Sequence, residues 1–535
     1  MNFLLLLLFQ QNIITKVRHL SFIIITLTAA IALPGCKSNP PTEKKNNKPN
    51  IIFILADDLG YSEVGVYGQD KIETPNIDQL AATGMRFTNF YSGAPVCAPA
   101  RSVLLTGLHS GHTPIRGNHE WGERGDVWDF AKAVTDPNLE GQYPLPDSTI
   151  TLAKVLQNSG YATGMVGKWG LGGPLSNSIP NTMGFDFFYG YNCQRQAHTY
   201  FPQHLWKNRE KVLLNNKLVV PNTKLEKNSD PLDTASYADY HLTDYAPRLM
   251  HEEALQFIAD NKANPFFLYY ASPIPHAPLQ APRKWVDYYR EKFGDETPYL
   301  GDRSYFPNRY PHATYAAMVS YLDEQVGELV QKLKTLGLYE NTLIIFTSDN
   351  GPTFNGGSDS PYFNSAKPFK SERTWGKGYV KEGGIRVPMI ASWPGIIDVK
   401  TESPLISSFY DMMPTLCEIT GASVPLTDGL SILPTMQGRP QDQVEHDYLY
   451  WEFPQYGGQQ AVRMGDWKGI RSNIKNNKES MVFELYNLKT DITEENDVAN
   501  EYPEIAAQIR QIFDKEHELS DIPRFRMPQL GDPEE

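Results

Sequence analysis

Cysteine is scarce in this chain, which contains four cysteines among 535 residues. Cys36 ends an N-terminal apolar segment and is predicted to carry a lipid, so Cys97, Cys193 and Cys417 remain. Because three cysteines cannot all pair, a disulfide framework does not explain them. We expect Cys193 and Cys417 to be buried apolar residues, and Cys97 to serve a chemical purpose.

Clusters of basic residues are also missing. The chain has 62 acidic and 49 basic residues and a net charge of -13, and no run of lysine or arginine forms a stripe. This balance argues against a nucleic-acid partner. An anionic substrate must therefore be bound by local cations or by a metal ion.

No apolar run is long enough for a comfortable transmembrane helix. The run 20–33 follows basic residues and leads to Cys36 in a pattern similar to the lipobox of bacterial lipoproteins. We predict a signal peptide over 1–35, lipidation of Cys36 and a polar tether over 36–48. A plain secretory signal is the alternative. Either signal implies export, to the periplasm or, for a lipoprotein, to the outer membrane or cell surface.

The rest of the chain has a globular composition, with 41% apolar and 21% charged residues. Short apolar runs alternate with segments of helical periodicity, which predicts an α/β fold with a large mixed, mostly parallel sheet flanked by helices. The strand candidates are 51–55, 161–166, 266–270, 343–346 and 387–391. The helix candidates are 76–83, 150–158, 315–336 and 411–419.

The sequence pattern changes after residue 421. Segments 460–472 and 481–488 are typical of paired antiparallel strands, and a helix is predicted over 503–517. The predicted domains are a large domain at 49–425 and a C-terminal α+β subdomain at 426–535.

Reactive side chains lie beside the five predicted strands. Because ligands bind just outside the carboxyl ends of strands in open α/β sheets, we expect these side chains to meet at one site. Two pairs among them offer hard oxygen ligands, which suit calcium or magnesium rather than zinc. Either pair alone is more often a turn or a helix cap. The residues are Asp57, Asp58, Lys168, His276, Asp349, Asn350 and Lys377.

Cys97 begins a segment that predicts a helix. Pro99 fits the first turn, which places Cys97 at the helix N-terminus, where exposed amides favour an anion. Arg101 lies one turn further on the same face and can neutralise a neighbouring negative group. A thiol in this position could also act directly as a thiolate nucleophile.

The segment from Cys97 through Pro99 and Arg101 to Ser102, Leu105, Thr106 and Gly107 is similar to the signature of type I sulfatases. In this family, part of the alkaline phosphatase superfamily, the cysteine is oxidised to formylglycine before or during export. The chain resembles exported arylsulfatase-like glycan sulfatases of bacteria from about residue 49 into the C-terminal sheet. Matching motifs lie at 50–60, 74–76, 167–169, 275–276, 348–351, 377 and 382–388.

This resemblance implies a calcium-bound formylglycine hydrate and a covalent sulfate intermediate at position 97. The resemblance also makes His276 and Lys377 the candidates to protonate the leaving oxygen. It implies that Arg101 and Lys168 position the nucleophile and stabilise the anion. It also implies a formylglycine-generating maturation enzyme as a partner and sulfated polysaccharides or their oligosaccharides as substrates. The implied calcium ligands are Asp57, Asp58, Cys97, Asp349 and Asn350.

The chain departs from the family pattern at Gly170, where a histidine is common. His112, in the loop after the nucleophile helix, is our candidate to replace that base. His198 lies in the segment 195–240, which, like 280–312, is predicted to be a long excursion that contributes to substrate recognition. His198 is therefore predicted to line a sugar subsite, although ordinary loop packing explains such a residue equally well.

Two other functions fit the same residues. A phosphate or phosphonate monoester hydrolase of the same superfamily could use the same calcium-bound nucleophile. A surface glycan-binding protein with a decayed active site is the alternative from another class. It is disfavoured because chemically competent residues occupy every nucleophile, metal and cation position except Gly170.

Overall fold

A computed structural model describes residues 48–476 and 478–534. The predicted signal peptide, Cys36 and all of the predicted tether except Lys48 lie outside these residues. Within the described part, no helix combines the length and the apolar character that a membrane span requires. The division into domains at residue 425 stays a prediction.

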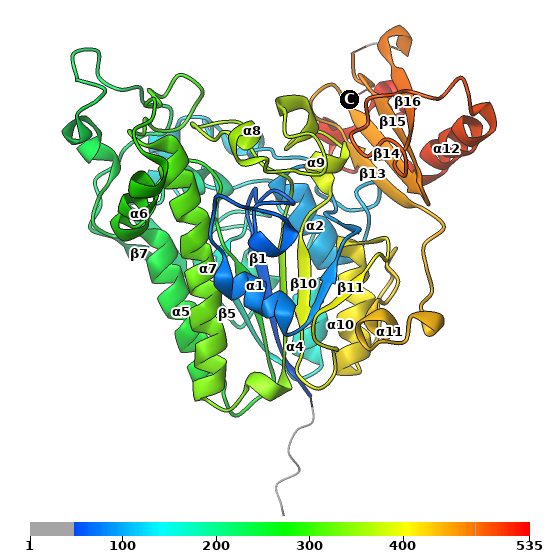
Figure 1. Cartoon of the computed structure of the whole chain (residues 1–535), viewed down its shortest axis with the longest axis horizontal. Helices are drawn as coiled ribbons and strands as arrows, with labels where there is room; N and C mark the ends of the chain where they lie inside the picture. The colour runs from blue at the N-terminus through cyan, green and yellow to red at the C-terminus, as the bar shows by residue number, and fades with distance from the viewer. Residues whose placement is uncertain (1–47, 477, 535) are drawn as a thin grey trace, which may run out of the picture. The chain divides into compact units, whose positions relative to one another are not determined.

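A large mixed sheet, mostly parallel, forms the centre of the described chain (Figure 1). The strands at its middle run parallel to one another, whereas β10 runs antiparallel to its neighbours. All five strand candidates are confirmed, as β1, β4, β8, β9 and β10. The strands of the sheet, in spatial order, are β11 (Thr401–Ser403), β2 (Met85–Phe87), β10 (Met389–Ser392), β9 (Thr342–Ser348), β1 (Asn50–Ala56), β8 (Phe266–Ala271), β4 (Ala162–Lys168), β5 (Phe187–Tyr191), β6 (His204–Lys207) and β7 (Glu210–Leu213).

Strand β1 is apolar on both faces because helices cover both faces of the sheet. Ile52 pairs with Leu268 of β8 on one side and with Ile344 of β9 on the other. Alternate β1 residues face opposite layers, so Phe53 and Ile52 belong to two separate apolar cores. This two-sided burial fixes β1 in the middle of the sheet.

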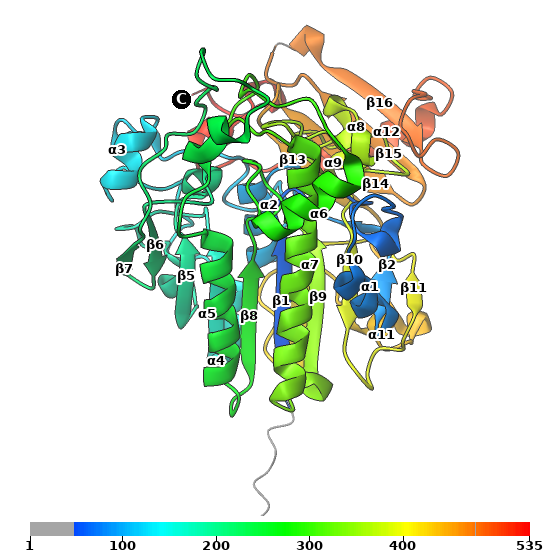
Figure 2. The ribbon, with the colours of Figure 1, turned by 60° about the vertical axis from the view of Figure 1, so that its left-hand side comes forward.

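Two groups of helices cover the sheet (Figure 2). One face packs against α1 (Pro75–Ala82), α5 (Ala246–Asp260) and α7 (Pro311–Thr335), and α6 (Arg283–Phe293) packs on α7. The other face packs against α2 (Cys97–Thr106), α4 (Leu152–Asn158) and α10 (Met412–Thr420). The predicted helices are confirmed. Helix α7 starts earlier than predicted, at Pro311, because proline is favoured at the first position of a helix.

The C-terminal sheet contains four antiparallel strands, β13 (Leu449–Phe453), β14 (Gln459–Met464), β15 (Trp467–Ser472) and β16 (Val482–Asn487). The predicted segment 460–472 is a hairpin that turns at Gly465, whose φ is 57°. Strand β13 was not predicted. Helix α12 (Pro503–Glu516) packs on this sheet, as expected. The remaining short elements are β3 (Phe90–Tyr91), β12 (Ser407–Ser408), α3 (Phe130–Thr135), α8 (Ser360–Phe363), α9 (Glu382–Ile385) and α11 (Leu433–Met436).

A buried ionic cluster joins the C-terminal sheet to α9. Lys468 of β15 is fully buried, and its Nζ lies 2.8 Å from Glu382 Oε1 and 3.0 Å from Glu494 Oε1. Burial raises the pKa of Glu382, but Lys468, Arg463 and Arg386 outweigh burial and hold this pKa well below its usual range. Lys468 thus bridges two buried carboxylates, and Arg386 and Arg463 supply further positive charge to Glu382.

Replacing Lys468 with alanine should destabilise the protein, because both carboxylates would stay buried without their shared cation. We expect a loss of about 3–5 kcal/mol in the free energy of unfolding, measured by denaturant titration. The matched control is Arg439→Ala, which removes an exposed partner of Asp442 and should cost less than about 1 kcal/mol. Equal effects of the two substitutions would contradict this role of Lys468.

Candidate active site

The carboxyl ends of four adjacent strands bring most of the predicted site residues together. Asp57 and Asp58 follow β1, Asp349 and Asn350 follow β9, and Lys168 ends β4. Each of these side chains is at most 1% exposed. His276 follows β8 and is also buried, so four neighbouring strands supply one compact group.

Cys97 points into this group from the first residue of α2. Its Sγ lies 3.1 Å from Asp57 Oδ1 and 3.5 Å from Lys377 Nζ. Arg101, one turn along α2, reaches Asp349 Oδ2 at 3.1 Å. The helix therefore presents both a nucleophile position and a cation to the strand ends, as its sequence predicted.

Cations surround the carboxylates. Lys168 Nζ lies 2.5 Å from Asp57 Oδ2, and Lys377 Nζ lies 2.7 Å from Asp58 Oδ1. Arg101 Nη2 lies 3.4 Å from Asp57 Oδ2. Three carboxylates and three cations thus form one largely buried cluster, which needs this balance because an unpaired buried charge is costly.

Asp58 has a backbone conformation that is rare for its residue type, with φ of 66°. Its N–H donates to Asp349 Oδ1 at 3.1 Å, and Asn350 Nδ2 donates to Asp58 Oδ1 at 2.8 Å. These bonds tie the end of β1 to the end of β9. The strained turn therefore holds the carboxylate toward the other candidate ligands.

The carboxyl groups titrate in opposite directions. Burial raises the pKa of Asp57, but Lys168, His276, Arg101 and Lys377 together lower it far below its ordinary value. Burial and the negative charge of Asp57 raise the pKa of Asp349 to about 7. Burial also raises the pKa of Asp58, despite the nearby Lys377. The surrounding cations therefore favour the ionised form of Asp57 more strongly than that of Asp58 or Asp349.

The thiol of Cys97 is difficult to ionise in these surroundings. Burial raises its pKa well above the ordinary value, and the charges of Asp349 and Asp57 raise it further. The lowered pKa that a helix N-terminus alone would produce is therefore absent. A nucleophile that depends on ionisation of this thiol does not fit the site.

A hard divalent cation fits the residues at the strand ends. Asp57, Asp58 and Asp349 supply carboxylate oxygens, and Asn350 Oδ1 is a buried acceptor without a hydrogen-bond partner among the described residues. Oxygen donors of this kind suit calcium or magnesium. A cation there would satisfy the orphaned amide oxygen and the crowded carboxylates together.

A cavity of about 680 Å³ opens onto Cys97, Lys168, His276 and Lys377. Its volume lies within the usual range of small-molecule sites. Aromatic side chains from distant segments line its walls, together with amide and cationic groups. They are Trp128, Phe130, Tyr305, Phe354, Tyr379, Tyr456, Asn118, Gln194, Asn222, Asn355, Arg195 and Arg373.

Most of these wall residues have no recognisable pattern in the sequence. Trp128, for example, lies in a segment without clear periodicity, and only the folded chain shows that it reaches the cavity. Glu120 also lines this cavity, and burial raises its pKa to about 7.

The two predicted substrate-binding histidines have different locations. His198 lines the cavity and stacks on His276, with 5.6 Å between ring centroids and 10° between planes. His112 does not line it, and its Nδ1 instead lies 3.0 Å from Asp428, beside Glu516 and Glu518. The structure therefore does not bring His112 to Cys97, because Asp428 holds the imidazole in another cluster.

Gln194 limits the space for a side chain at position 170. Its φ is 74°, and a Cβ built there would lie 3.0 Å from Gln194 Oε1 and 3.1 Å from Gln194 Cβ. A Cβ at position 170 would be tight against Gln194, which would have to shift by a few tenths of an ångström, and the positive φ would strain any residue other than glycine. Both features disfavour a histidine at this position.

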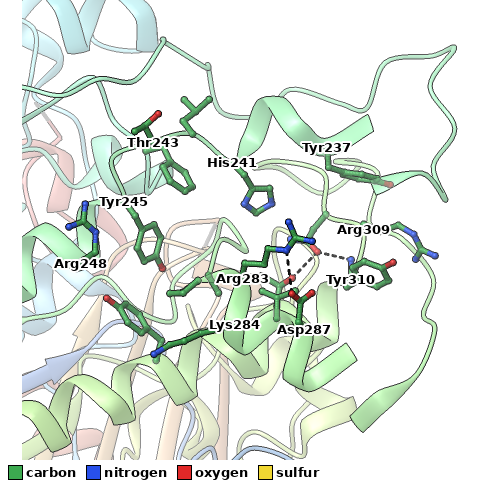
Figure 3. Close-up of a pocket in the computed structure, with 18 of the residues that line it drawn as sticks. Tyr237, His241, Thr243, Tyr245, Arg248, Arg283, Lys284, Asp287, Arg309 and Tyr310 are labelled. Atoms are coloured by element: carbon green, nitrogen blue, oxygen red, sulfur yellow. Dashed lines mark hydrogen bonds and ion pairs between the residues drawn. The ribbon is translucent and has the colours of Figure 1, made fainter. Parts of the chain in front are cut away.

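A second cavity, of about 850 Å³, lies between α5, α6, α7 and the excursion at 234–245 (Figure 3). Its cations are paired with carboxylates, as Arg248 with Glu252 and Lys284 with Glu324. None of the strand-end residues lines it. Although it is larger, it lacks a nucleophile and a metal-ligand set, so we assign the chemistry to the cavity at Cys97.

The fold and this site define a hydrolase of the alkaline phosphatase-like class. A family model described as Sulfatase matches residues 49–422, and a model of the C-terminal region of N-sulphoglucosamine sulphohydrolase matches residues 371–519. The chain belongs to the sulfatase family and is a sulfuric ester hydrolase. The resemblance stated from the motifs is thereby confirmed.

Known relatives span most of the chain. Arylsulfatase A of Homo sapiens is 33% identical over 442 residues, which cover 78% of this chain and 74% of the relative. N-acetylgalactosamine-6-sulfatase of Homo sapiens is 32% identical over 405 residues, which cover 74% of this chain and 67% of the relative. The solved structure of Ps i-CgsB in complex with k-i-k-neocarrahexaose has a TM-score of 0.68 and 28% identity, covering 88% of this chain and 94% of that one.

Calcium should raise the temperature of thermal unfolding, because it binds the folded ligand set and not the unfolded chain. At a free concentration 100-fold above the dissociation constant the gain is about 2.7 kcal/mol. Asn350→Leu removes one oxygen ligand and should lose most of this gain in a calorimetric scan. The control Asn496→Leu changes an exposed asparagine outside the site and should keep it. An undiminished calcium effect in Asn350→Leu would argue against this ligand set.

Proposed function

We propose that the protein hydrolyses sulfate esters on sulfated polysaccharides or their oligosaccharides, with Cys97 matured to formylglycine. The observation that carries the proposal is the burial of Cys97 between the strand-end carboxylates and Lys377. These surroundings disfavour a thiolate and suit a nucleophile activated by a hard cation. A formylglycine-generating maturation enzyme is the partner that this chemistry requires.

The substrate class is supported by the relatives and by the cavity. One relative is named for a sulfated N-acetylgalactosamine, and one solved structure holds a neocarrahexaose. The cavity walls supply aromatic faces and amide groups, which suit pyranose rings and their hydroxyls.

The calcium ion would be held by Asp57, Asp58, Asp349 and Asn350 together with residue 97. When bound, calcium and formylglycine supply Lewis-acid activation and an oxygen nucleophile. The protein residues then bind and orient the anion. Arg101 and Lys168 contact the carboxylates at the floor of the site and brace both the nucleophile and the sulfate.

Lys377 is the better placed of the two proposed proton donors. Burial lowers the pKa of Lys377, but the negative charges of Asp58 and Asp57 outweigh burial and raise it, so the ammonium keeps its proton. Burial, Lys377 and Lys168 lower the pKa of His276, and its Nδ1 lies 2.5 Å from the carbonyl oxygen of Ala277. This contact assigns the ring proton to Nδ1 and leaves Nε2 as an acceptor. We therefore assign proton donation to Lys377 and substrate orientation to His276.

Release of sulfate requires a group that accepts a proton within the cavity. Gly170 supplies none, and His112 is held by Asp428. His198 lines the cavity, and among residues 48–476 and 478–534 no group hydrogen-bonds its ring. Burial, His276 and Lys168 lower its pKa well below the ordinary value, so the imidazole is neutral. His198 thus replaces His112 as our candidate for this base.

Maturation of Cys97 can be tested directly by mass spectrometry of the peptide that contains it. Protein produced with the maturation enzyme should carry an aldehyde at position 97, whereas Cys97→Ala cannot. The variant should lose at least about 1,000-fold in kcat/KM for an aryl sulfate, as expected when a nucleophile is removed. A fully active protein with an unmodified thiol would disprove this mechanism.

Phosphate or phosphonate ester hydrolysis is the competing reaction at the same site. Phosphonate monoester hydrolase of Agrobacterium radiobacter shares the fold, at 18% identity and a TM-score of 0.55. We expect higher kcat/KM for an aryl sulfate than for the matched aryl phosphate, because the balanced cations best suit a single negative charge. Faster turnover of the phosphate would reverse this assignment.

We further propose that the protein is exported and anchored through a lipid on Cys36. The segment before Cys36 supports this, since it joins basic residues, an apolar run and an abrupt change to polar composition.

A further inference from the structure

We propose that Arg195 and Gln194 form a subsite for a second anionic group on the substrate, a carboxylate or another sulfate beside the sulfate ester that is cleaved. This inference rests on the proposed function and narrows it to polyanionic glycans. Both residues belong to the short helix Gln194–His198 and line the cavity that contains Cys97.

Arg195 is held in place without being neutralised. Its guanidinium donates to the carbonyl oxygens of Val127 and Trp128, the latter at 2.9 Å, and stacks over the rings of Trp128 and Phe130. A guanidinium has five N–H donors, and these bonds engage two. In the described part of the chain no carboxylate forms an ion pair with it. The remaining donors are therefore available to an anion in the cavity.

The nearest acidic candidate does not cancel this charge. Glu120 lines the same cavity, but burial raises its pKa to about 7, even though Arg195 opposes the shift. Gln142 Nε2 donates to Glu120 Oε1 at 2.7 Å and so engages one of the two carboxyl oxygens. Near neutral pH the glutamate is only partly ionised, so Arg195 keeps a net positive field toward the cavity.

Gln194 adds an unused acceptor beside this cation. Its backbone N–H donates to Gln142 Oε1 at 2.8 Å, which fixes the residue. Its buried Oε1 has no hydrogen-bond partner within 48–476 and 478–534, although an unpaired buried acceptor costs free energy. A sugar hydroxyl is a donor that would satisfy it. Gly170 makes this placement possible, since a side chain there would meet Gln194.

Trp128 completes the subsite with a flat apolar face. It is 61% exposed although it is one of the largest side chains in the cavity wall. Exposed aromatic faces of this kind stack on the apolar side of a pyranose ring. One acidic sugar could thus stack on Trp128, donate a hydroxyl hydrogen bond to Gln194 and place its anionic group at Arg195.

The test compares three oligosaccharides that share the reacting sulfate. One has no other charge, one carries a second sulfate and one carries a carboxylate on the adjacent sugar. Wild-type protein should show higher kcat/KM for at least one of the two doubly charged compounds, and the preferred compound identifies the anionic group. Equal kcat/KM for all three would overturn the inference.

Arg195→Gln should lower kcat/KM for the preferred compound by about 10- to 100-fold and for the singly charged compound by less than about 3-fold. Arg195→Lys should keep part of the preference because it keeps the charge but loses the fork of donors. The matched control is Arg248→Gln in the neighbouring cavity (Figure 3), where Arg248 is paired with Glu252 at 2.6 Å. The Arg248→Gln variant should leave kcat/KM unchanged for all three oligosaccharides. Equal losses on all three compounds in Arg195→Gln would contradict the subsite.

A binding measurement separates this inference from the proposed function. The desulfated, carboxylated oligosaccharide is titrated calorimetrically against wild-type protein and Arg195→Gln. If aryl sulfate is not hydrolysed but the acidic sugar binds in an Arg195-dependent way, the proposed function fails and the subsite stands. If aryl sulfate is hydrolysed and neither binding nor turnover depends on Arg195, only the subsite fails.

Discussion

Every carboxylate buried at the ends of β1 and β9 needs a cation close by, because an unpaired buried charge is costly. Three aspartates converge there, and Arg101, Lys168 and Lys377 reach them from α2, β4 and a distant loop. Removing Arg101 would take the cation from Asp349, and removing Lys377 would take it from Asp58, and a buried carboxylate that loses its cation costs several kcal/mol, whereas Asp57 is paired with both Lys168 and Arg101. A divalent cation held there would add positive charge to a cluster in which burial raises the pKa values of Asp349 and Asp58 despite the nearby protein cations.

This constraint explains the arrangement of the fold around the site. Strand β1 lies between β8 and β9, so their loops start from one edge of the sheet. Helix α2 must begin at Cys97 for both its first residue and Arg101 to reach that edge. The C-terminal sheet contributes indirectly to the site, because its Lys468 forms an ion pair with Glu382. Glu382 lies five residues after Lys377 along the chain. The loop that carries Lys377 is thereby anchored at its far end by a second buried ionic cluster.

The parts of this arrangement that follow local rules could be predicted from the sequence. The apolar runs before Asp57 and Asp349 predict buried strands, and the signature at Cys97 predicts both a helix start and its chemistry. Strand β13 was missed because its residues do not alternate, being buried on both faces. His112 was misplaced for another reason. Its partner Asp428 lies more than three hundred residues away, and no local pattern reports such a contact.

The structure adds a packing contact to the interpretation of Gly170. In the sequence this glycine stands where the family commonly has a basic histidine, whereas in the structure Gln194 lies against it, with Oε1 3.0 Å from where a Cβ would be. The backbone N–H of Gln194 donates to Gln142 Oε1 and so holds the start of the short helix that also carries Arg195 and His198. The same backbone therefore presents an unpaired amide oxygen, an un-neutralised guanidinium and a neutral imidazole to one cavity. Because a Cβ at position 170 would press on Gln194, the absence of a basic group at this position and the placement of the Gln194 amide in the cavity wall are linked by one packing contact.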